Sequence, residues 1–465
     1  MNHRTLPTLL ITCAGLTFSA CTNVGPNYQK PSDNLPDAFK NANWPAAPST
    51  GDPYTAFRDG ELNRLLRAAE KNNQDLSAAL ARIDQSRALL GLSRADQTPT
   101  LVADLAGNQN LDSRNTKLPS SGGAYRDYDA QLTLAYEVDL WGRVRRGVAQ
   151  AEANLSATEA DYAAALLSLK GEVARNYLTL RSLDREIALL DQTSDLRKQR
   201  LDLTGSRRKA GTASGLDFAR AETEYQSTRA EVARLAQRRG ELENSLAALT
   251  GEAASTFAIA PKVSTPHIPQ VPSGVPSDLL RRRPDIVAAE RRLAASNEGV
   301  GVAIATYLPS LTLTGVGGAR SLQAADIFNP KSVFYSAGAG LFTPIIQGGR
   351  VKADREQAEA LFREALATYR QTMLSAIRDT ENALLGVRSQ DQALASQRKA
   401  TEASERTARL VRVRYEGGLD SLFEVTETER QTLEQERLLT QTELTRQLAA
   451  VNLIQALGGE WKAAK

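Results

Sequence analysis

Histidine, cysteine and methionine are scarce in this chain, and so are aromatic residues. Only two of each of the first three occur among 465 residues, and 5% of the residues are aromatic. So few soft ligands and imidazoles exclude histidine- or cysteine-based metal clusters and cysteine/histidine catalysis. A low aromatic content beside 24% charged residues is poor material for a compact core, whereas it suits long helices packed through small and aliphatic side chains.

Neither sign of charge dominates. Lys and Arg number 57, and Asp and Glu number 54, so no global field points to nucleic acid. The run Arg281–Arg283 lacks accompanying aromatic residues for base stacking, which favours a structural role. No nucleophile or phosphate loop stands out, and acidic residues on long helices are expected to be solvated flanks. We therefore expect no catalytic residue, no metal site and no nucleic-acid partner.

Proline is absent from two long windows, residues 120–260 and 345–465. Because a proline inside a helix costs roughly 3 kcal/mol, both windows are predicted to be long helical territory. In the first window apolar residues recur with a mean step of about 3.5 residues, the heptad period of helices packed side by side. The pattern predicts one helix from Arg143 to Lys209, roughly 100 Å long. A single globular domain does not need a helix of that length.

The chain carries the marks of an internal duplication, at offsets of 207 to 210 residues. Thr98–Leu101 recurs as Leu308–Leu311, and Trp141–Arg143 recurs as Gly348–Arg350. Short similarities that recur at a nearly constant offset over most of a chain imply one duplicated architectural unit. A unit of this length is more often a wall element of a larger assembly than an enzyme domain.

Each copy predicts a helical hairpin with a tight, polar tip. In the first copy Gly211 suits a left-handed helix cap, and Ser214 with Asp217 makes a capping box that starts the return helix. Basic residues precede the glycine, where cations stabilise a helix C-terminus. The second copy repeats this chemistry with the residues Gly418, Ser421 and Glu424.

Before each long helix the apolar residues switch to a two-residue period. Apolar and polar residues alternate from Tyr128 to Val138, a length that suits a strand crossing a bilayer. A partner strand is expected from Thr100 to Asn110, on the other side of the loop Ser113–Tyr125. The second copy predicts weaker, glycine-rich strands at Leu311–Ala319 and Val333–Phe342.

The alternation also assigns the two faces of the first repeat's second strand. Leu132, Leu134 and Tyr136 are predicted to face lipid, whereas Gln131 and Thr133 are predicted to face a wet lumen. A water-exposed hairpin of a soluble protein is the alternative. Two strand pairs, each beside a long helix of an exported chain, argue against that alternative.

Residues 1–20 are predicted to be a secretory signal peptide. They carry a basic start, the apolar stretch Leu9–Phe18 and a small-residue cleavage site. The string Phe18-Ser19-Ala20-Cys21 resembles a bacterial lipobox, so Cys21 is expected to carry lipid at the mature N-terminus. The alternative is ordinary cleavage, with Cys21 left as a free thiol. By the sorting habit of such lipoproteins, Thr22 favours the outer membrane over the inner membrane.

Proline-rich stretches mark the remaining boundaries. Residues 21–60 are expected to be a flexible lipid-anchored tether and an equatorial wrap, and residues 253–277 a linker between the copies. The first repeat then covers residues 61–252 and the second covers residues 278–465. Each repeat is expected to hold a helix, two barrel strands and a long helical hairpin.

Two strings make the sequence recognisable, Tyr136–Arg143 (YEVDLWGR) and Arg281–Ile286 (RRRPDI). Together with Gly25–Pro31 near the N-terminus, they resemble the lipoprotein, or NodT-like, branch of the TolC-type outer-membrane efflux ducts. These ducts are the outer membrane factors of RND-type pumps. The match runs from Cys21 to Trp461.

The resemblance implies a homotrimer that is mainly α-helical with a transmembrane β part. Four strands per chain would close into a twelve-stranded β-barrel, and the long hairpins would form a trimeric periplasmic α-barrel. The implied function is a passive exit duct in the outer membrane, docked by a periplasmic adaptor and an inner-membrane transporter of the RND type. No cofactor is implied beyond the covalent lipid on Cys21. A periplasmic adaptor lipoprotein is the alternative, although adaptors have one hairpin rather than two.

The second tip resembles the stretch that closes the periplasmic mouth in related ducts. Phe423, Glu427 and Arg430 are spaced by four and three residues, so they lie on one helical face. The resemblance implies an apolar constriction at Phe423 and a tie between neighbouring chains through Glu427 and Arg430. The alternative is an ordinary ion pair within the helix. The first copy has Leu216, Arg220 and Thr223 at the equivalent positions. The tip residues expected to dock the adaptor are Gly211, Ser214, Asp217, Gly418, Ser421 and Glu424.

Overall fold

The computed structural model describes residues 23–32, 39–41, 53–113, 115, 124–269 and 283–459. The predicted signal peptide, Cys21 and Trp461 lie outside the described residues, as do most of the loop after the first strand and parts of both proline-rich stretches. The chain divides into two compact units. The first comprises the described residues within Met1–Ser32, Arg82–Glu159 and Ala288–Arg370, and the second comprises those within Asp33–Ala81, Ala160–Val287 and Gln371–Lys465.

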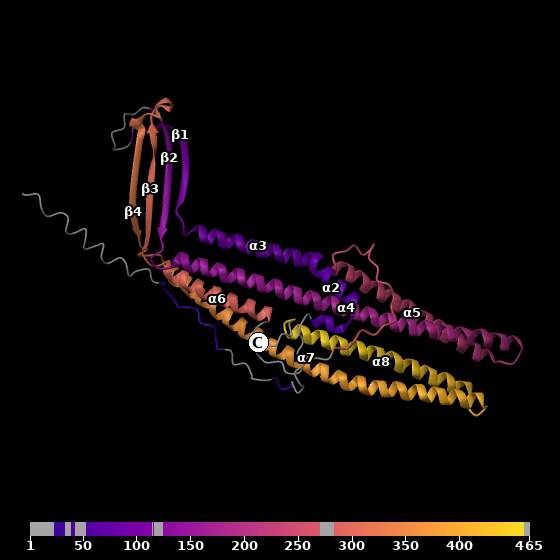
Figure 1. The fold of residues 1–465 in the computed structure, drawn as a ribbon. Coiled ribbons are helices and arrows are strands. Elements are labelled where there is room, and N and C mark those ends of the chain that lie inside the picture. Colours follow the sequence, from indigo (N-terminus) through magenta and orange to yellow (C-terminus); the bar gives the residue numbers. More distant parts are fainter. Residues whose placement is uncertain are drawn as a thin grey trace, which may run out of the picture. The chain divides into compact units, whose positions relative to one another are not determined.

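The first unit contains one four-stranded antiparallel sheet, in the order β1-β2-β3-β4 (Figure 1). The strands are β1 Thr100–Leu111, β2 Ala124–Val138, β3 Ser310–Ser321 and β4 Val333–Phe342. All four predicted strands therefore form. β2 begins earlier than its alternation predicts, because polar side chains extend the ladder: Asn108 donates to Asp127 across the two strands at 3.1 Å.

The register gives the sheet two chemically distinct faces, because residues directly opposite each other on paired strands share a face. Leu134, for example, lies opposite both Leu101 and Gly315. One face carries Leu101, Leu105, Ala130, Leu132, Leu134, Tyr136, Leu313, Ala319, Tyr335 and Leu341, with Gln109, Arg126 and Ser321 as polar exceptions. The other carries Asp104, Asn108, Asp127, Asp129, Gln131, Thr133, Glu137, Thr312, Thr314 and Arg320, with Val102, Val316, Phe334 and Phe342 as apolar exceptions. The predicted separation of apolar from polar residues is confirmed, and the medium that each face meets stays a prediction.

Seven α-helices accompany the sheet in the described part of the chain. They are α2 Gly60–Asn72, α3 Gln74–Ala95, α4 Arg143–Lys209, α5 Gly215–Leu249, α6 Pro284–Ala305, α7 Arg350–Glu416 and α8 Leu422–Ala456. Short 3-10 helices lie at η1 Pro53–Phe57, η3 Ala324–Asp326 and η4 Pro330–Ser332. α4 has the predicted bounds. α4 and α7 are 67 residues long and α5 and α8 are 35, so the duplication seen in the sequence recurs in the structure.

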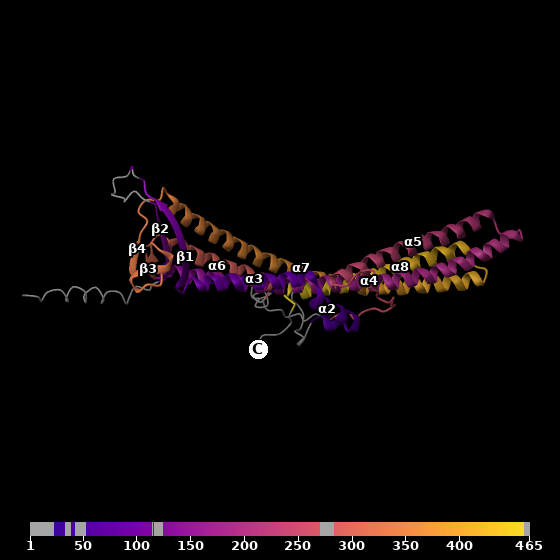
Figure 2. The same ribbon diagram turned by 90° about the horizontal axis from the view of Figure 1, so that it is seen from above.

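The hairpins α4–α5 and α7–α8 make up most of the second unit, where their helices run alongside one another in both views (Figures 1 and 2). The apolar heptad positions of α4 supply the core: Val173, Tyr177 and Leu180 are completely buried. Further along the hairpins, Leu433 of α8 packs against a cluster of α4 and α5 residues. None of the helices described is both long and apolar enough to cross a membrane.

A short turn joins β2 to α4 in the first unit. Asp139 caps α4 by accepting hydrogen bonds from two backbone N–H groups, at 3.2 and 2.9 Å. Gly142 has a φ of +81°, and a Cβ atom at this position would lie 2.3 Å from Asn23, so the turn needs glycine. Trp141 donates from its indole nitrogen to the carbonyl oxygen of Pro309 at 2.8 Å. The turn is thereby tied to the residue that precedes β3.

The segment around Gly25, part of the predicted tether and wrap, contacts two helices of the first unit. Arg146 of α4 is 3% exposed, donates to the carbonyl oxygen of Gly25 at 3.3 Å and pairs with Glu298 at 2.7 Å. Tyr28 donates to Glu290 of α6 at 2.6 Å, and burial together with this bond raises the pKa of Tyr28. A buried guanidinium needs acceptors, and the N-terminal backbone supplies them. The segment is therefore held on α4 and α6.

Candidate gate at the hairpin tips

The first hairpin tip has the geometry that the sequence predicts. Gly211 has a φ of +77°, a left-handed conformation that favours glycine. The Oγ of Ser214 accepts a hydrogen bond from the N–H of Asp217 at 3.1 Å, and the carboxylate of Asp217 accepts one from the N–H of Ser214 at 3.3 Å. This reciprocal pair is the predicted capping box. It fixes the start of α5 directly after the turn.

The second tip is built similarly but carries an extra ion pair. Gly418 also has a φ of +77°, and Ser421 accepts from the N–H of Glu424 at 3.3 Å, one half of a capping box. Asp420 pairs with Arg414 across the tip at 2.8 Å. The hydrogen bond from Arg414 holds the pKa of Asp420 below its usual range. Docking of an adaptor at either tip stays a prediction.

The three predicted gate residues lie along one face near the start of α8. Phe423 is 65% exposed in the single chain. Arg430 pairs with Glu427 at 2.7 Å within the helix and approaches Glu434 at 3.7 Å. The bond from Arg430 holds the pKa of Glu427 below its usual range and raises the pKa of Arg430. Within one chain the pair is thus the ordinary helical one, and a tie between chains stays a prediction.

A cavity of about 570 Å³ lies between the two return helices near their tips. All three predicted gate residues of α8 line it, together with their counterparts on α5, Leu216, Arg220 and Thr223. The duplication identifies these two sets as equivalent in sequence. The fold places them around the same space, so a change at the second tip also alters the surroundings of the first.

Two carboxylates of α8 join the hairpins, and sequence reasoning missed both. Glu429 pairs with Arg200 of α4 at 2.6 Å and with Arg412 of α7 at 2.7 Å. Glu443, two heptads further along α8, forms the same kind of bridge at 2.6 and 3.2 Å with the residues Arg185 and Arg398. The expectation that acidic residues of the long helices are solvated flanks is wrong for these two. Their two-heptad spacing was the available signal.

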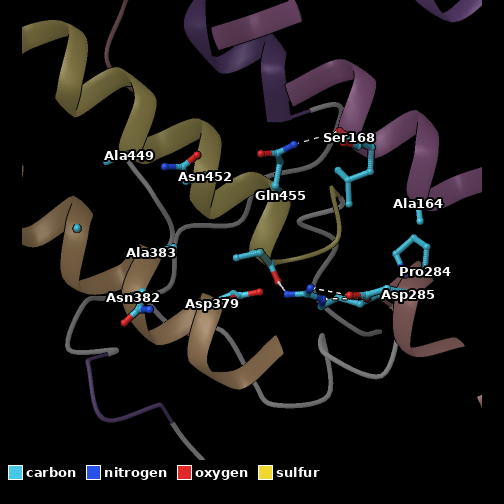
Figure 3. Close-up of a pocket in the computed structure, with 14 residues that line it drawn as sticks. Ala164, Ser168, Pro284, Asp285, Asp379, Asn382, Ala383, Ala449, Asn452 and Gln455 are labelled. Carbon is cyan, nitrogen blue, oxygen red and sulfur yellow. Dashed lines mark hydrogen bonds and ion pairs between the residues drawn. The ribbon is translucent and has the colours of Figure 1, made fainter. Parts of the chain in front are cut away.

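A second cavity, of about 500 Å³, is lined by residues of α4, α6, α7 and α8 in the second unit (Figure 3). At its edge Arg283 donates to the carbonyl oxygen of Ala456 at 2.9 Å and pairs with Asp285 at 2.7 Å. Arg283 therefore links the start of α6 to the end of α8, the structural role predicted for the arginine string. Arg281 and Arg282 lie outside the described residues. No group of His, Cys, Asp or Glu in the described ranges could hold a metal ion.

Comparison of the sequence with known protein families identifies a family that matches both repeats. A model of the family described as outer membrane efflux protein matches residues 65–252 and 275–459. The chain belongs to this family. An outer membrane efflux protein is a transport channel, so the alternative of a periplasmic adaptor is wrong, and the family is one of ducts rather than of enzymes.

Curated relatives of this efflux protein match along most of its length. The pyoverdine export outer membrane protein OpmQ of Pseudomonas aeruginosa is 34% identical over 88% of this chain and 87% of its own. Outer membrane protein OprJ of the same organism is 33% identical over 96% and 94%. The solvent efflux pump outer membrane protein SrpC of Pseudomonas putida is 30% identical over the full length of both.

Solved structures share the fold of this efflux protein. The outer-membrane channel OprN has a TM-score of 0.86 and 29% identity, with 94% of this chain and 99% of that chain covered. The open state of the MtrE outer membrane channel of Neisseria gonorrhoeae has a TM-score of 0.81 and 27% identity, with 95% and 99% covered. The sheet and the hairpins are therefore wall elements of a channel that combines a helical tunnel with a β-barrel.

Proposed function

We propose that this efflux protein works as a homotrimer and is the passive exit duct of a tripartite pump in a Gram-negative outer membrane. The observation that carries the proposal is the amphipathic sheet, whose edge strands β1 and β4 have no partner strand among the described residues. These edges are 12 and 10 residues long. Each unpaired backbone group in hydrocarbon costs several kcal/mol, so the edges must be closed by further copies.

Three copies of a four-stranded sheet give a barrel of twelve strands. An even number of antiparallel strands is the rule for bacterial outer-membrane barrels, and closure removes every open edge. The apolar face, with Leu134 at its centre, would then meet lipid, and the polar face, with Thr133, would line the lumen. The hairpins of the three chains would continue the wall as an α-barrel in the periplasm.

The partners proposed for this duct are a periplasmic adaptor and an inner-membrane transporter of the RND type. A passive duct has no energy source of its own, so a transporter has to drive the cargo into it. The exposed, capped tips around Gly211 and Gly418 are the surfaces proposed for the adaptor. SrpC is the outer membrane protein of a solvent efflux pump, which supports the same arrangement here.

The test of the trimer is a gel of outer-membrane fractions with and without heating. We expect a trimer-sized band in the unheated sample that converts to the monomer on heating, because a closed barrel resists detergent until its ladders melt. An unheated sample that contains only monomer would contradict the proposal. Channel activity of the purified trimer in planar bilayers then separates a duct from a closed structural ring.

A covalent lipid on Cys21 is proposed as a second anchor. Asn23, two residues later in the sequence, lies against Gly142 at the turn between β2 and α4. One acyl chain binds a membrane only marginally, and the barrel adds its own anchorage, so the lipid should help assembly more than retention. We expect the mature chain to begin at Cys21, and we expect its intact mass to include the mass of acyl groups. An unmodified mass would refute the lipid, and Cys21→Ser should remain in the outer membrane but assemble more slowly.

A further inference from the structure

We infer that β4 of one chain pairs with β1 of the next chain in a single register, with Leu341 opposite Leu105 and Gly340 opposite Ala106. The inference rests on the proposed homotrimer and adds to it the residues that form the seam between chains. Each of the two open edges is therefore covered by a neighbouring copy of this chain.

The ladders within the chain obey the duplication residue by residue. Thr100 lies opposite Ala135 in the first hairpin, and Ser310 lies opposite Phe342 in the second. β1 thus maps onto β3 with an offset of 210 residues, and β2 maps onto β4 with an offset of 207. The whole β3–β4 ladder follows from the β1–β2 ladder under these two offsets.

The ladder between β2 and β3 joins the first repeat to the second and is the template for the seam. A ring of three chains needs the same kind of junction, from the second repeat of one chain to the first repeat of the next. In the template Leu134 lies opposite Gly315. Adding 207 to Leu134 gives Leu341 of β4, and subtracting 210 from Gly315 gives Leu105 of β1. Leu341 is therefore placed opposite Leu105. Thr133 opposite Val316 becomes Gly340 opposite Ala106 in the same way.

This register brings the exposed apolar residues of the two edges together. Leu105 is 85% exposed and Leu341 is 68% exposed in the single chain, and both lie on the apolar face of the sheet. The same offsets place Tyr335 opposite Leu111, and both of these side chains are also strongly exposed. A slip of one residue would turn the apolar residues of β4 to the polar face of the next chain. A slip of two residues keeps the faces but breaks the equivalence with the template.

The turn after β4 provides a second surface for the same neighbour. Within the chain, the β2–α4 turn contacts the residue before β3 through Trp141 and Pro309. Across the seam, the equivalents of these two residues are Gly348 and Pro99. Glycine cannot supply the indole hydrogen bond, but the isoleucines at 345 and 346 are almost wholly exposed beside it. Apolar contact with the next chain would replace the hydrogen bond and cover these side chains.

Disulfide crosslinking tests the register in the full-length protein in its membrane. The chain has two cysteines, Cys13 in the predicted signal peptide and Cys21 at the predicted lipid site, so the barrel offers no competing thiol. One variant combines Gly340→Cys with Ala106→Cys, and a second combines Leu341→Cys with Leu105→Cys. Successive pairs in an antiparallel ladder alternate between wide and narrow Cα separations, so one of these two variants has the narrow geometry that a disulfide favours.

The controls keep the face and shift the partner by two residues. They combine Gly340→Cys with Asp104→Cys or Asn108→Cys, and Leu341→Cys with Ala103→Cys or Gly107→Cys. We expect at least one of the inferred pairs to give covalent trimers on a non-reducing gel, with a yield at least fivefold above its shifted controls. A higher crosslinking yield from a shifted control would overturn the register. The register would also be overturned if both inferred variants form trimers as the parent does but neither gives a crosslink.

The heat-dissociable trimer is measured for every variant before oxidation. If the parent forms no trimer, the proposed function fails together with the seam. If trimers form and the shifted pairs crosslink, the trimer stands and the register alone is wrong. The two inferred pairs lie on opposite faces of the sheet, so a folding defect in one variant leaves the other as an independent test.

Discussion

Glu429 of α8 lies 2.6 Å from Arg200 of α4, so an acid of the second hairpin is bonded to a base of the first. The carboxylate also holds Arg412 of α7, and it therefore joins three helices at the level of the tips. Ion pairs of this kind connect the two hairpins near the cavity that the predicted gate residues line. When the tips open, these ion pairs must either break or move together with the helices that they join.

Glu429→Gln should loosen the tips without preventing assembly. The change keeps the side-chain shape and removes two partly exposed ion pairs, which together contribute about 1 kcal/mol. We expect hydrogen exchange in the neighbouring parts of α4 and α8 to rise about fivefold, with the trimer retained. Glu405→Gln is the matched control, because the ion pair of Glu405, at 3.8 Å, lies within α7 and does not join the two hairpins. Equal exchange in the two variants would contradict a role for Glu429 in joining the hairpins.

The gate hypothesis predicts a gain of conductance when its residues are removed. If Glu427 and Arg430 tie neighbouring chains, changing both to Ala should raise single-channel conductance in planar bilayers and antibiotic leak in cells. Phe423→Ala should act in the same direction by widening an apolar constriction. Double alanine substitution of Arg220 and Thr223, the equivalents of Glu427 and Arg430 in the first tip, serves as the comparison. Parent-like conductance of the double variant and of Phe423→Ala would place the gate elsewhere.

If the pair of Glu427 and Arg430 closes the gate, acid should open it. The pKa of Glu427 is depressed by its bond from Arg430, so the pair is present above the usual Glu range and is lost as pH falls through the lowered pKa. Single-channel conductance should therefore rise as the pH falls below the usual pKa of Glu. The Glu427→Gln variant should lack this pH-dependent rise. Asp420→Asn is the control, because Asp420 has a depressed pKa at the same tip but lies outside the gate face. A rise that survives in Glu427→Gln would be assigned to another acid.

The two faces of β2 should differ in their tolerance of charge. Leu134→Arg puts a cation on the apolar face near the middle of the sheet, at about 2 to 4 kcal/mol if that face meets lipid. Thr133→Arg puts the same residue on the polar face, where it should cost little. The yield of heat-dissociable trimer in outer-membrane fractions measures the difference. Equal losses for the two neighbouring variants would reverse or remove the assignment of lipid and lumen.

Much of the gate region was predictable because its geometry is local. Gly211 and Gly418 adopt the positive φ expected of helix caps, and Ser214 forms the expected capping box. The predicted spacing of Phe423, Glu427 and Arg430 follows from the helix alone. The cavity that these residues share with α5 was not predictable, since it depends on how two hairpins approach each other.

The sequence by itself determined the long helices and the four strands, although β2 begins at Ala124 rather than at Tyr128. Proline exclusion and the heptad period predicted α4 from Arg143 to Lys209, and alternation predicted the four strands, because each signal arises within a few neighbouring residues. Only the tertiary structure decided which distant charges meet. Arg200 and Glu429 are 229 residues apart, and Arg146 takes its acceptors from the N-terminal segment around Gly25. A sequence displays such charges, but the partner of each depends on which helix faces which, and packing sets that arrangement.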